Sequence, residues 1–190
     1  MSRPAALAII LAEHAALSRL LGAMQALVTD ARRRALAPQF DTLRAMLFYV
    51  DEFPERLHHV KETTMLFARL RELSPDAHAL LDRLDREHAH GASRVRELAH
   101  KLSAWQLLGE ARRDAFERAL AAYSAFYLEH MRIEETEVLP LAERVLGDDD
   151  WRMLERAFGL HRDGLTGAQP EALYAGLFKT IVAAMPGAHA

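Results

Sequence analysis

The sequence predicts an all-α protein, an up-down-up-down four-helix bundle, and three observations lead to that prediction. Its 190 residues suit one domain with one sizeable core. Ala, Leu, Arg and Glu are abundant while Gly and Pro are few, which favours helix over sheet. Apolar residues recur at helical spacing over four long segments separated by brief breaks. Four helices joined by such short loops lie antiparallel.

The first two helices are bounded by prolines. The first helix is predicted over about residues 5–33, and Pro38 marks the break after it. The second is predicted over about residues 39–73, with Pro54 inside it. An internal proline removes one backbone hydrogen bond, so we expect a kink there.

The third and fourth helices have clear start and stop signals. Ser74 is a good N-cap and Pro75 suits the first helical position, so the third helix is predicted over about residues 75–105. Gly109 is the next break, and the fourth helix is predicted over about residues 110–146.

The last part of the chain predicts smaller elements. Residues 147–150 form a turn that caps a short fifth helix over about residues 151–162, and a loop follows over residues 163–170. We therefore divide the chain into residues 1–165, the bundle with its fifth helix, and residues 166–190, a C-terminal extension with room for one further helix packed on the bundle.

Charge, cysteine count and hydropathy exclude several classes of function. The net charge is -3 and no basic cluster stands out, so we expect no nucleic-acid partner. There are no cysteines, which excludes disulfides and thiolate metal sites. No apolar run approaches the ~20 residues that span a bilayer, so we expect no membrane association. Residues 5–12 are apolar, but Glu13 and His14 follow at once, which argues against a signal peptide. A cytoplasmic location is expected.

Two of the long helices carry the same His-x-x-x-Glu pattern. It occurs at His58 and Glu62 on the second helix, and at His130 and Glu134 on the fourth. Residues four apart lie on one helix face, so each imidazole and carboxylate can converge on a metal ion. The other two helices each add one histidine. The complete predicted set of metal ligands is His14, His58, Glu62, His88, His130 and Glu134.

Counting residues from the connecting turns places this set at one level in the bundle. His14 and His58 lie about 20 and 21 residues on either side of the turn near residues 35–38. His88 and His130 each lie about 21 residues from the turn near Gly109. At a rise of about 1.5 Å per residue these levels agree within one helical turn.

The chemistry of the predicted set suits two transition-metal ions. A buried carboxylate without a partner costs several kcal/mol, and a cation removes that cost. Imidazole and carboxylate ligands suit iron, manganese or zinc. Two ions that share both carboxylates keep open positions for water, an oxo bridge or a small ligand, which implies binding or chemistry rather than a purely structural site.

A rival pattern is the Glu-x-x-His pair of ferritin-like di-iron bundles. The chain has it at Glu55 and His58, and again at Glu97 and His100. His100 lies 12 residues past His88, hence roughly 18 Å along the helix axis from the predicted site. The two pairs therefore cannot meet in an antiparallel bundle.

The constellation resembles the hemerythrin-like, or HHE cation-binding, family. The segments that carry the likeness are Glu13-His14, FPERLHHVKE at 53–62, REHAHG at 86–91 and YLEHMRIEETEVLPLAE at 127–143. The likeness runs to about residue 161 and looks closest to the stand-alone bacterial branch. It implies a four-helix bundle with a centre of two non-haem iron ions, Fe2+ or Fe3+. The four histidines would be terminal ligands, two per iron, and the two glutamates would bridge.

The chain departs from the oxygen-carrying hemerythrins at two places. Those proteins have a fifth histidine where this chain has Ala92, and His90 points about 200° away from His88 and is a poor substitute. Carriers also use His-x4-Asp where this chain has His130 and Glu134. The resemblance therefore favours a protein that senses or handles O2, nitric oxide or iron in stress response.

Two other functions stay open. One is a di-iron oxidoreductase acting on peroxide or nitric oxide, although the sequence favours a protein that is not a classical enzyme. The other is a metal-free helical scaffold. The expected partners are metal ions and a small diatomic ligand, and the sequence leaves a homodimer open.

Five further residues near the predicted site have a structural or a supporting role. His59 points about 100° away from the preceding ligand, which favours a surface or supporting histidine. Tyr127 is expected to be a core aromatic. Glu87, Glu129 and Glu137 are either solvated or accept hydrogen bonds from the ligand imidazoles.

Overall fold

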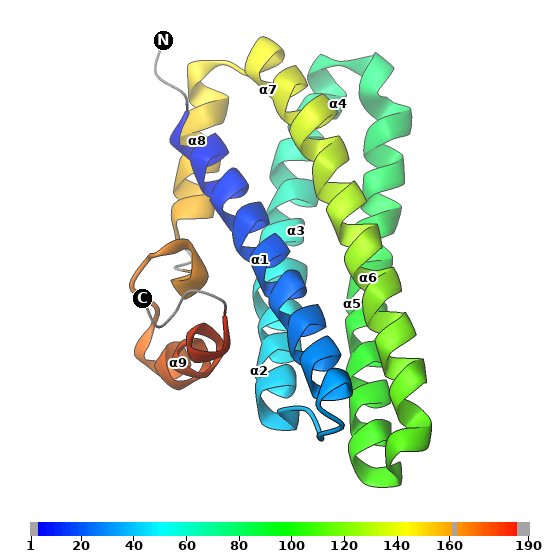
Figure 1. The fold of residues 1–190 in the computed structure, drawn as a ribbon. Coiled ribbons are helices and arrows are strands. Elements are labelled where there is room, and N and C mark those ends of the chain that lie inside the picture. Colours follow the sequence, from blue (N-terminus) through cyan, green and yellow to red (C-terminus); the bar gives the residue numbers. More distant parts are fainter. Residues whose placement is uncertain (1–3, 161–162, 186–190) are drawn as a thin grey trace.

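The computed structural model describes residues 4–160 and 163–185. These residues form helices and connecting turns, with no strand among them. The four long helical segments lie antiparallel and alternate in direction, so the predicted all-α bundle is confirmed (Figure 1). The first segment is a single helix, α1 (Ala5–Arg33), with the predicted bounds.

The second long segment is a continuous helix that contains two π-helical turns. Its parts are α2 (Phe40–Val50), a π-helical turn (Asp51–His58), α3 (His59–Lys61), a second π-helical turn (Glu62–Phe67) and α4 (Ala68–Leu73). Pro54 lies inside the first π-helical turn. The proline therefore does not end the helix. The local change to π-helix accommodates a residue that has no backbone N–H to donate.

The third long segment begins with a 3-10 turn (Pro75–Ala77) and continues as α5 (His78–Leu108). It ends three residues later than the sequence predicted, at the glycine itself. Gly109 has φ of 83°, a left-handed conformation that glycine adopts without strain and that stops the helix.

The fourth long segment has the predicted extent and one π-helical interruption. A 3-10 turn (Glu110–Arg112) leads into α6 (Arg113–Ile133), then a π-helical turn (Glu134–Val138) and α7 (Leu139–Val145). Both glutamates of the two His-x-x-x-Glu patterns thus begin a π-helical turn.

The fifth helix, α8 (Asp148–Gly159), begins three residues earlier than predicted and ends at Gly159. The Asp150 carboxylate accepts a hydrogen bond from the backbone N–H of Gly147 at 3.0 Å. This contact caps the helix at Gly147, so Asp148, Asp149 and Asp150 form its first turn. The predicted last residue of this helix, Arg162, lies outside the described residues.

The C-terminal segment contains one further helix, α9 (Ala175–Ala184). Phe178 and Ile181 on this helix are buried in the apolar core beside α2. The buried Tyr49 hydroxyl also donates to the Asp163 carboxylate at 2.6 Å, which ties the start of the segment to α2. The division of the chain near residue 165 stays a prediction.

The apolar core has two parts, separated by a polar layer. One part contains apolar residues between positions 16 and 28 of α1, together with Met131 of α6. The other part contains apolar residues between positions 6 and 10 of α1, together with Ile133 of α6. Along α1, His14 lies between the two parts of the core. Along the fourth segment, Glu134 lies directly after Ile133, near the boundary between the two parts. The predicted metal site therefore occupies the layer between two apolar cores.

The first helix meets the length and hydropathy of a membrane-spanning helix, contrary to the sequence expectation. An 18-residue window of α1 has a mean hydropathy of 1.5, and half of that window is buried inside the bundle. Core helices of helical bundles meet the same criteria, and α1 supplies apolar side chains to both parts of the core.

Candidate metal centre

Four histidine rings, one from each long segment, face one another in two pairs. Nε2 of His14 on α1 lies 3.1 Å from Nε2 of His58 in the second segment. Nε2 of His88 on α5 lies 2.9 Å from Nε2 of His130 on α6. The structure thus brings together, at one level, the four histidines that the sequence singled out.

The Glu62 carboxylate extends from one histidine pair to the other. Its Oε1 lies 3.2 Å from Nε2 of His58, and its Oε2 lies 3.6 Å from Nε2 of His88. Because the two oxygens face different pairs, this side chain has the arrangement of a bridging ligand.

Glu134 has the same arrangement from the fourth segment. Its Oε1 lies 3.2 Å from Nε2 of His130, and its Oε2 lies 3.4 Å from Nε2 of His14. Glu62 and Glu134 are 0% and 1% exposed, and among the described residues none of their four oxygen atoms accepts a hydrogen bond. Buried carboxylates without partners are costly, and a cation between the histidine pairs removes that cost.

The outer nitrogen of each histidine is held by an oxygen. Three of the rings donate from Nδ1 to a glutamate: His14 to Glu135 at 3.0 Å, His58 to Glu13 at 2.5 Å and His130 to Glu87 at 2.8 Å. The fourth, His88, donates from Nδ1 to the Thr63 hydroxyl at 2.9 Å, and Thr63 donates to Asp85 at 2.8 Å. A proton fixed on Nδ1 leaves the Nε2 lone pair directed into the site.

These outer partners were only partly expected from the sequence. Glu87 does accept a hydrogen bond from the His130 imidazole, as one of the two sequence interpretations predicted. Glu129 instead pairs with Arg132 on the helix surface, and Glu137 is exposed. Glu13, Thr63, Asp85 and Glu135 were missed because their partners lie on other helices, which spacing along one helix does not reveal.

The carboxylates make the centre favourable for positive charge. Burial by itself would lower the pKa of His58, but the carboxylates of Glu62 and Glu13 outweigh it and raise that pKa to about 10. Burial likewise opposes the charged form of His130, and Glu134 and Glu87 raise its pKa to about 9. The same carboxylates that favour a proton on these rings also favour a metal cation between them.

His90 and His100, the two other histidines weighed from the sequence, lie away from the centre. His100 and Glu97 are exposed, and Glu97 pairs with Lys101. His90 is exposed on α5 and bonds to the Arg86 carbonyl. The described part of the chain therefore gives no support to the ferritin-like pattern.

A second buried polar group lies beside the histidine layer. The Glu55 carboxylate accepts hydrogen bonds from the hydroxyls of Tyr123 and Tyr127 and contacts Nδ1 of His59 at 3.3 Å. Tyr127 is buried, as predicted, but its hydroxyl belongs to this group. Gly91 on α5 faces it, because a Cβ at residue 91 would overlap the Tyr127 hydroxyl and the Glu55 carboxylate.

We expect the Gly91→Ala variant to be destabilised by about 1–3 kcal/mol, because the added methyl group overpacks this buried group. The matched control is Gly22→Ala on the exposed face of α1, where a Cβ meets nothing within 4 Å. That variant should gain about 0.5–1 kcal/mol, since alanine is the better helix former. Urea unfolding monitored by circular dichroism measures both, and equal effects at the two sites would refute the assigned role of Gly91.

We expect Glu87→Ala to weaken metal binding about 10- to 100-fold, because Nδ1 of His130 loses the carboxylate that orients the ring. Glu129→Ala is the control, since Glu129 lies on the helix surface and pairs with the exposed Arg132. Competition with a chelating dye measures both affinities. If the two variants bind metal equally well, the Glu87 contact does not orient a ligand.

An antiparallel four-helix bundle with histidines and carboxylates from all four segments converging in its core defines a class of metal-cation-binding bundles. The chain belongs to the hemerythrin family, because the hemerythrin HHE cation binding domain matches its residues 5–142. The resemblance to this family is thereby confirmed, while the stand-alone bacterial branch stays a prediction, and membership implies cation binding. The comparisons with curated proteins and with solved structures gave no match.

Proposed function

We propose that the protein binds two non-haem iron ions and uses them to sense or handle O2, nitric oxide or iron in stress response. The observation that carries the proposal is the pair of buried carboxylates, without hydrogen-bond partners, extending between two facing histidine pairs. The proposed ligands are His14, His58, Glu62, His88, His130 and Glu134.

The distances within each histidine pair suit one ion per pair. Two imidazole nitrogens each about 2.1 Å from an ion, at a right angle, are about 3.0 Å apart. The Nε2 atoms of His14 and His58 are 3.1 Å apart, and those of His88 and His130 are 2.9 Å apart. Nitrogen and carboxylate donors without thiolates favour iron, manganese or zinc.

The protein's own groups prepare this centre in two ways. The outer carboxylates of Glu13, Glu87 and Glu135 hold the imidazole rings so that their lone pairs face inward. The two apolar cores above and below exclude bulk water from the layer. When bound, the iron pair would supply redox chemistry and open positions for a small ligand.

A small cavity beside the His14–His58 pair supports a ligand of diatomic size. Its volume is about 20 Å³, close to the space that one water molecule needs. Leu17, Phe53 and Leu57 give it apolar walls. A cavity of this size supports binding of a small ligand such as O2, nitric oxide or peroxide.

Elemental analysis combined with an optical spectrum tests this function. The purified protein, loaded anaerobically with ferrous iron, should contain two irons per chain, and its spectrum should change on exposure to O2 or nitric oxide. Steady turnover of peroxide or nitric oxide with a reductant would favour the oxidoreductase alternative. Absence of bound metal would leave only the metal-free scaffold. The cytoplasmic location also stays a prediction.

A further inference from the structure

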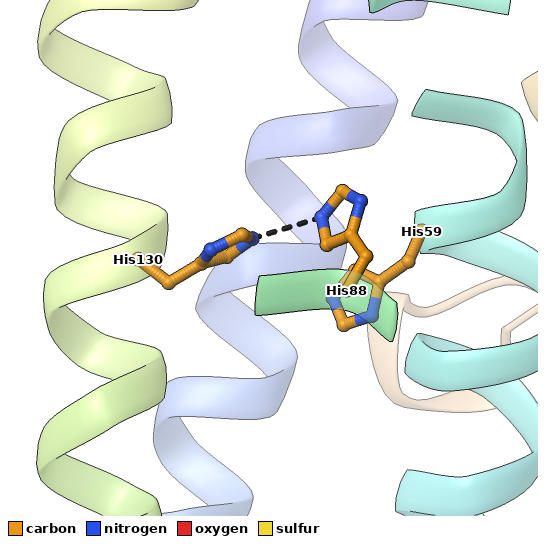
Figure 2. A group of neighbouring side chains, drawn as sticks. All are labelled: His59, His88 and His130. Atoms are coloured by element: carbon orange, nitrogen blue, oxygen red, sulfur yellow. Dashed lines mark hydrogen bonds between the residues drawn. The ribbon is translucent and has the colours of Figure 1, made fainter. Parts of the chain in front are cut away.

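His59 lies inside the bundle, although its spacing from His58 predicted a surface or supporting residue. It is 4% exposed. The centroid of its ring lies 4.3 Å from that of His88 and 5.6 Å from that of His130 (Figure 2). One possible ligand atom from each of these three rings lies within 4.8 Å of the other two. A third imidazole is therefore available on this side of the centre.

The helix geometry explains why both neighbouring histidines face inward. His58 ends one π-helical turn and Glu62 begins the next, with His59 directly after the first. A π-helical turn contains more residues than an α-helical turn, so successive side chains are separated by less than the ~100° of an α-helix. The smaller angle leaves the direction of His59 closer to that of His58 than α-helical spacing would.

The support of His59 resembles that of three of the four proposed ligand histidines, His14, His58 and His130. Its Nδ1 faces a buried carboxylate, Glu55, which accepts hydrogen bonds from two tyrosine hydroxyls. A proton on Nδ1 leaves Nε2 as the lone-pair nitrogen of this ring. The absence of a side chain at Gly91 provides the space that this supporting group occupies.

We propose that His59 is a fifth histidine ligand, bound to the ion that His88 and His130 share. The proposal rests on the proposed two-metal function and makes the two ions unequal. One ion has three imidazoles, and the other has only His14 and His58. The extra nitrogen donor reduces the open positions at the first ion, so a small ligand is directed to the second, which the cavity adjoins.

Coordination requires one movement of the His59 ring. The ring lies parallel to that of His88, with 12° between their planes, and two rings bound to one ion cannot remain stacked in this way.

Mössbauer spectroscopy of the full chain loaded anaerobically with two ⁵⁷Fe²⁺ ions tests the proposal. The wild-type protein should give two doublets of equal area. In His59→Ala one doublet should change and the other should not, and the affinity for one of the two ions should fall at least tenfold. The control is His90→Ala, an exposed histidine on α5, which should leave the spectrum unchanged.

An unchanged spectrum in a folded His59→Ala protein that still holds two irons would overturn the assignment of His59 alone. A wild-type protein without iron would instead refute the two-metal function. If His59→Ala does not fold, nitrogen NMR of wild-type protein with ¹⁵N-labelled histidine and bound Zn²⁺ decides the question. Five metal-bound imidazole nitrogens support the proposal, and four contradict it.

Discussion

The Glu134→Ala variant is expected to bind metal at least ~100-fold more weakly than the wild-type protein. Glu134 faces both histidine pairs, through Oε1 towards His130 and Oε2 towards His14, so its loss removes a donor from both ions at once. Removal of an outer partner alone typically costs about 10- to 100-fold, and a shared ligand should cost more. Elemental analysis after dialysis against a fixed concentration of free metal measures the effect.

The matched control for this variant is Glu137→Ala. Glu137 lies in the same π-helical turn as Glu134 but is exposed, so its replacement should leave both ions in place. Circular dichroism should show that both variants remain helical. A Glu134→Ala protein that retains two ions per chain would show that this carboxylate does not bridge them.

Metal removal is expected to lower the unfolding temperature by roughly 5–11 °C. A ligand present at 100 times its Kd stabilises the folded state by about 2.7 kcal/mol. For a chain of this size each kcal/mol corresponds to about 2–4 °C. The structural reason is that Glu62 and Glu134 are buried without hydrogen bonds, and a bound cation neutralises them. Thermal unfolding with and without a chelator measures the difference.

The Glu134→Ala protein provides the internal control for that measurement. Because this variant should hold little metal, the chelator should hardly change its unfolding temperature. A wild-type protein with the same unfolding temperature in both conditions would contradict metal binding to the buried carboxylates.

The level of the six proposed ligands could be predicted from the sequence because it depends on helix periodicity and loop position. His14 and His130 are each about 20 residues from a turn, and a regular helix converts that count into depth. The structure buries both rings in the layer where the count places them. Periodic elements of this length are what a sequence predicts best.

The position of His59 could not be predicted, because no sequence pattern indicates the π-helical turns around it. An α-helical spacing of ~100° from His58 directs that ring away from the site. The structure shows a π-helical turn up to His58 and another from Glu62, which changes the angle. Local changes of this kind depend on the tertiary contacts of the site and occur often at functional sites.

The outer carboxylates of Glu13 and Glu135 could not be predicted for a different reason. Glu13 adjoins His14 in sequence but accepts from His58, and Glu135 adjoins Glu134 but accepts from His14. Each contact crosses between helices, so it depends on their rotation about their own axes. Helical spacing within one segment carries no information about that rotation.

Anomalous X-ray scattering at the iron edge, from crystals of the anaerobically iron-loaded protein, tests the central claim most directly. Two iron peaks are expected, one beside the Nε2 atoms of His14 and His58 and one beside those of His88 and His130. Both Glu62 and Glu134 should lie between the peaks. A single peak, or iron bound away from these six side chains, would contradict the two-metal centre.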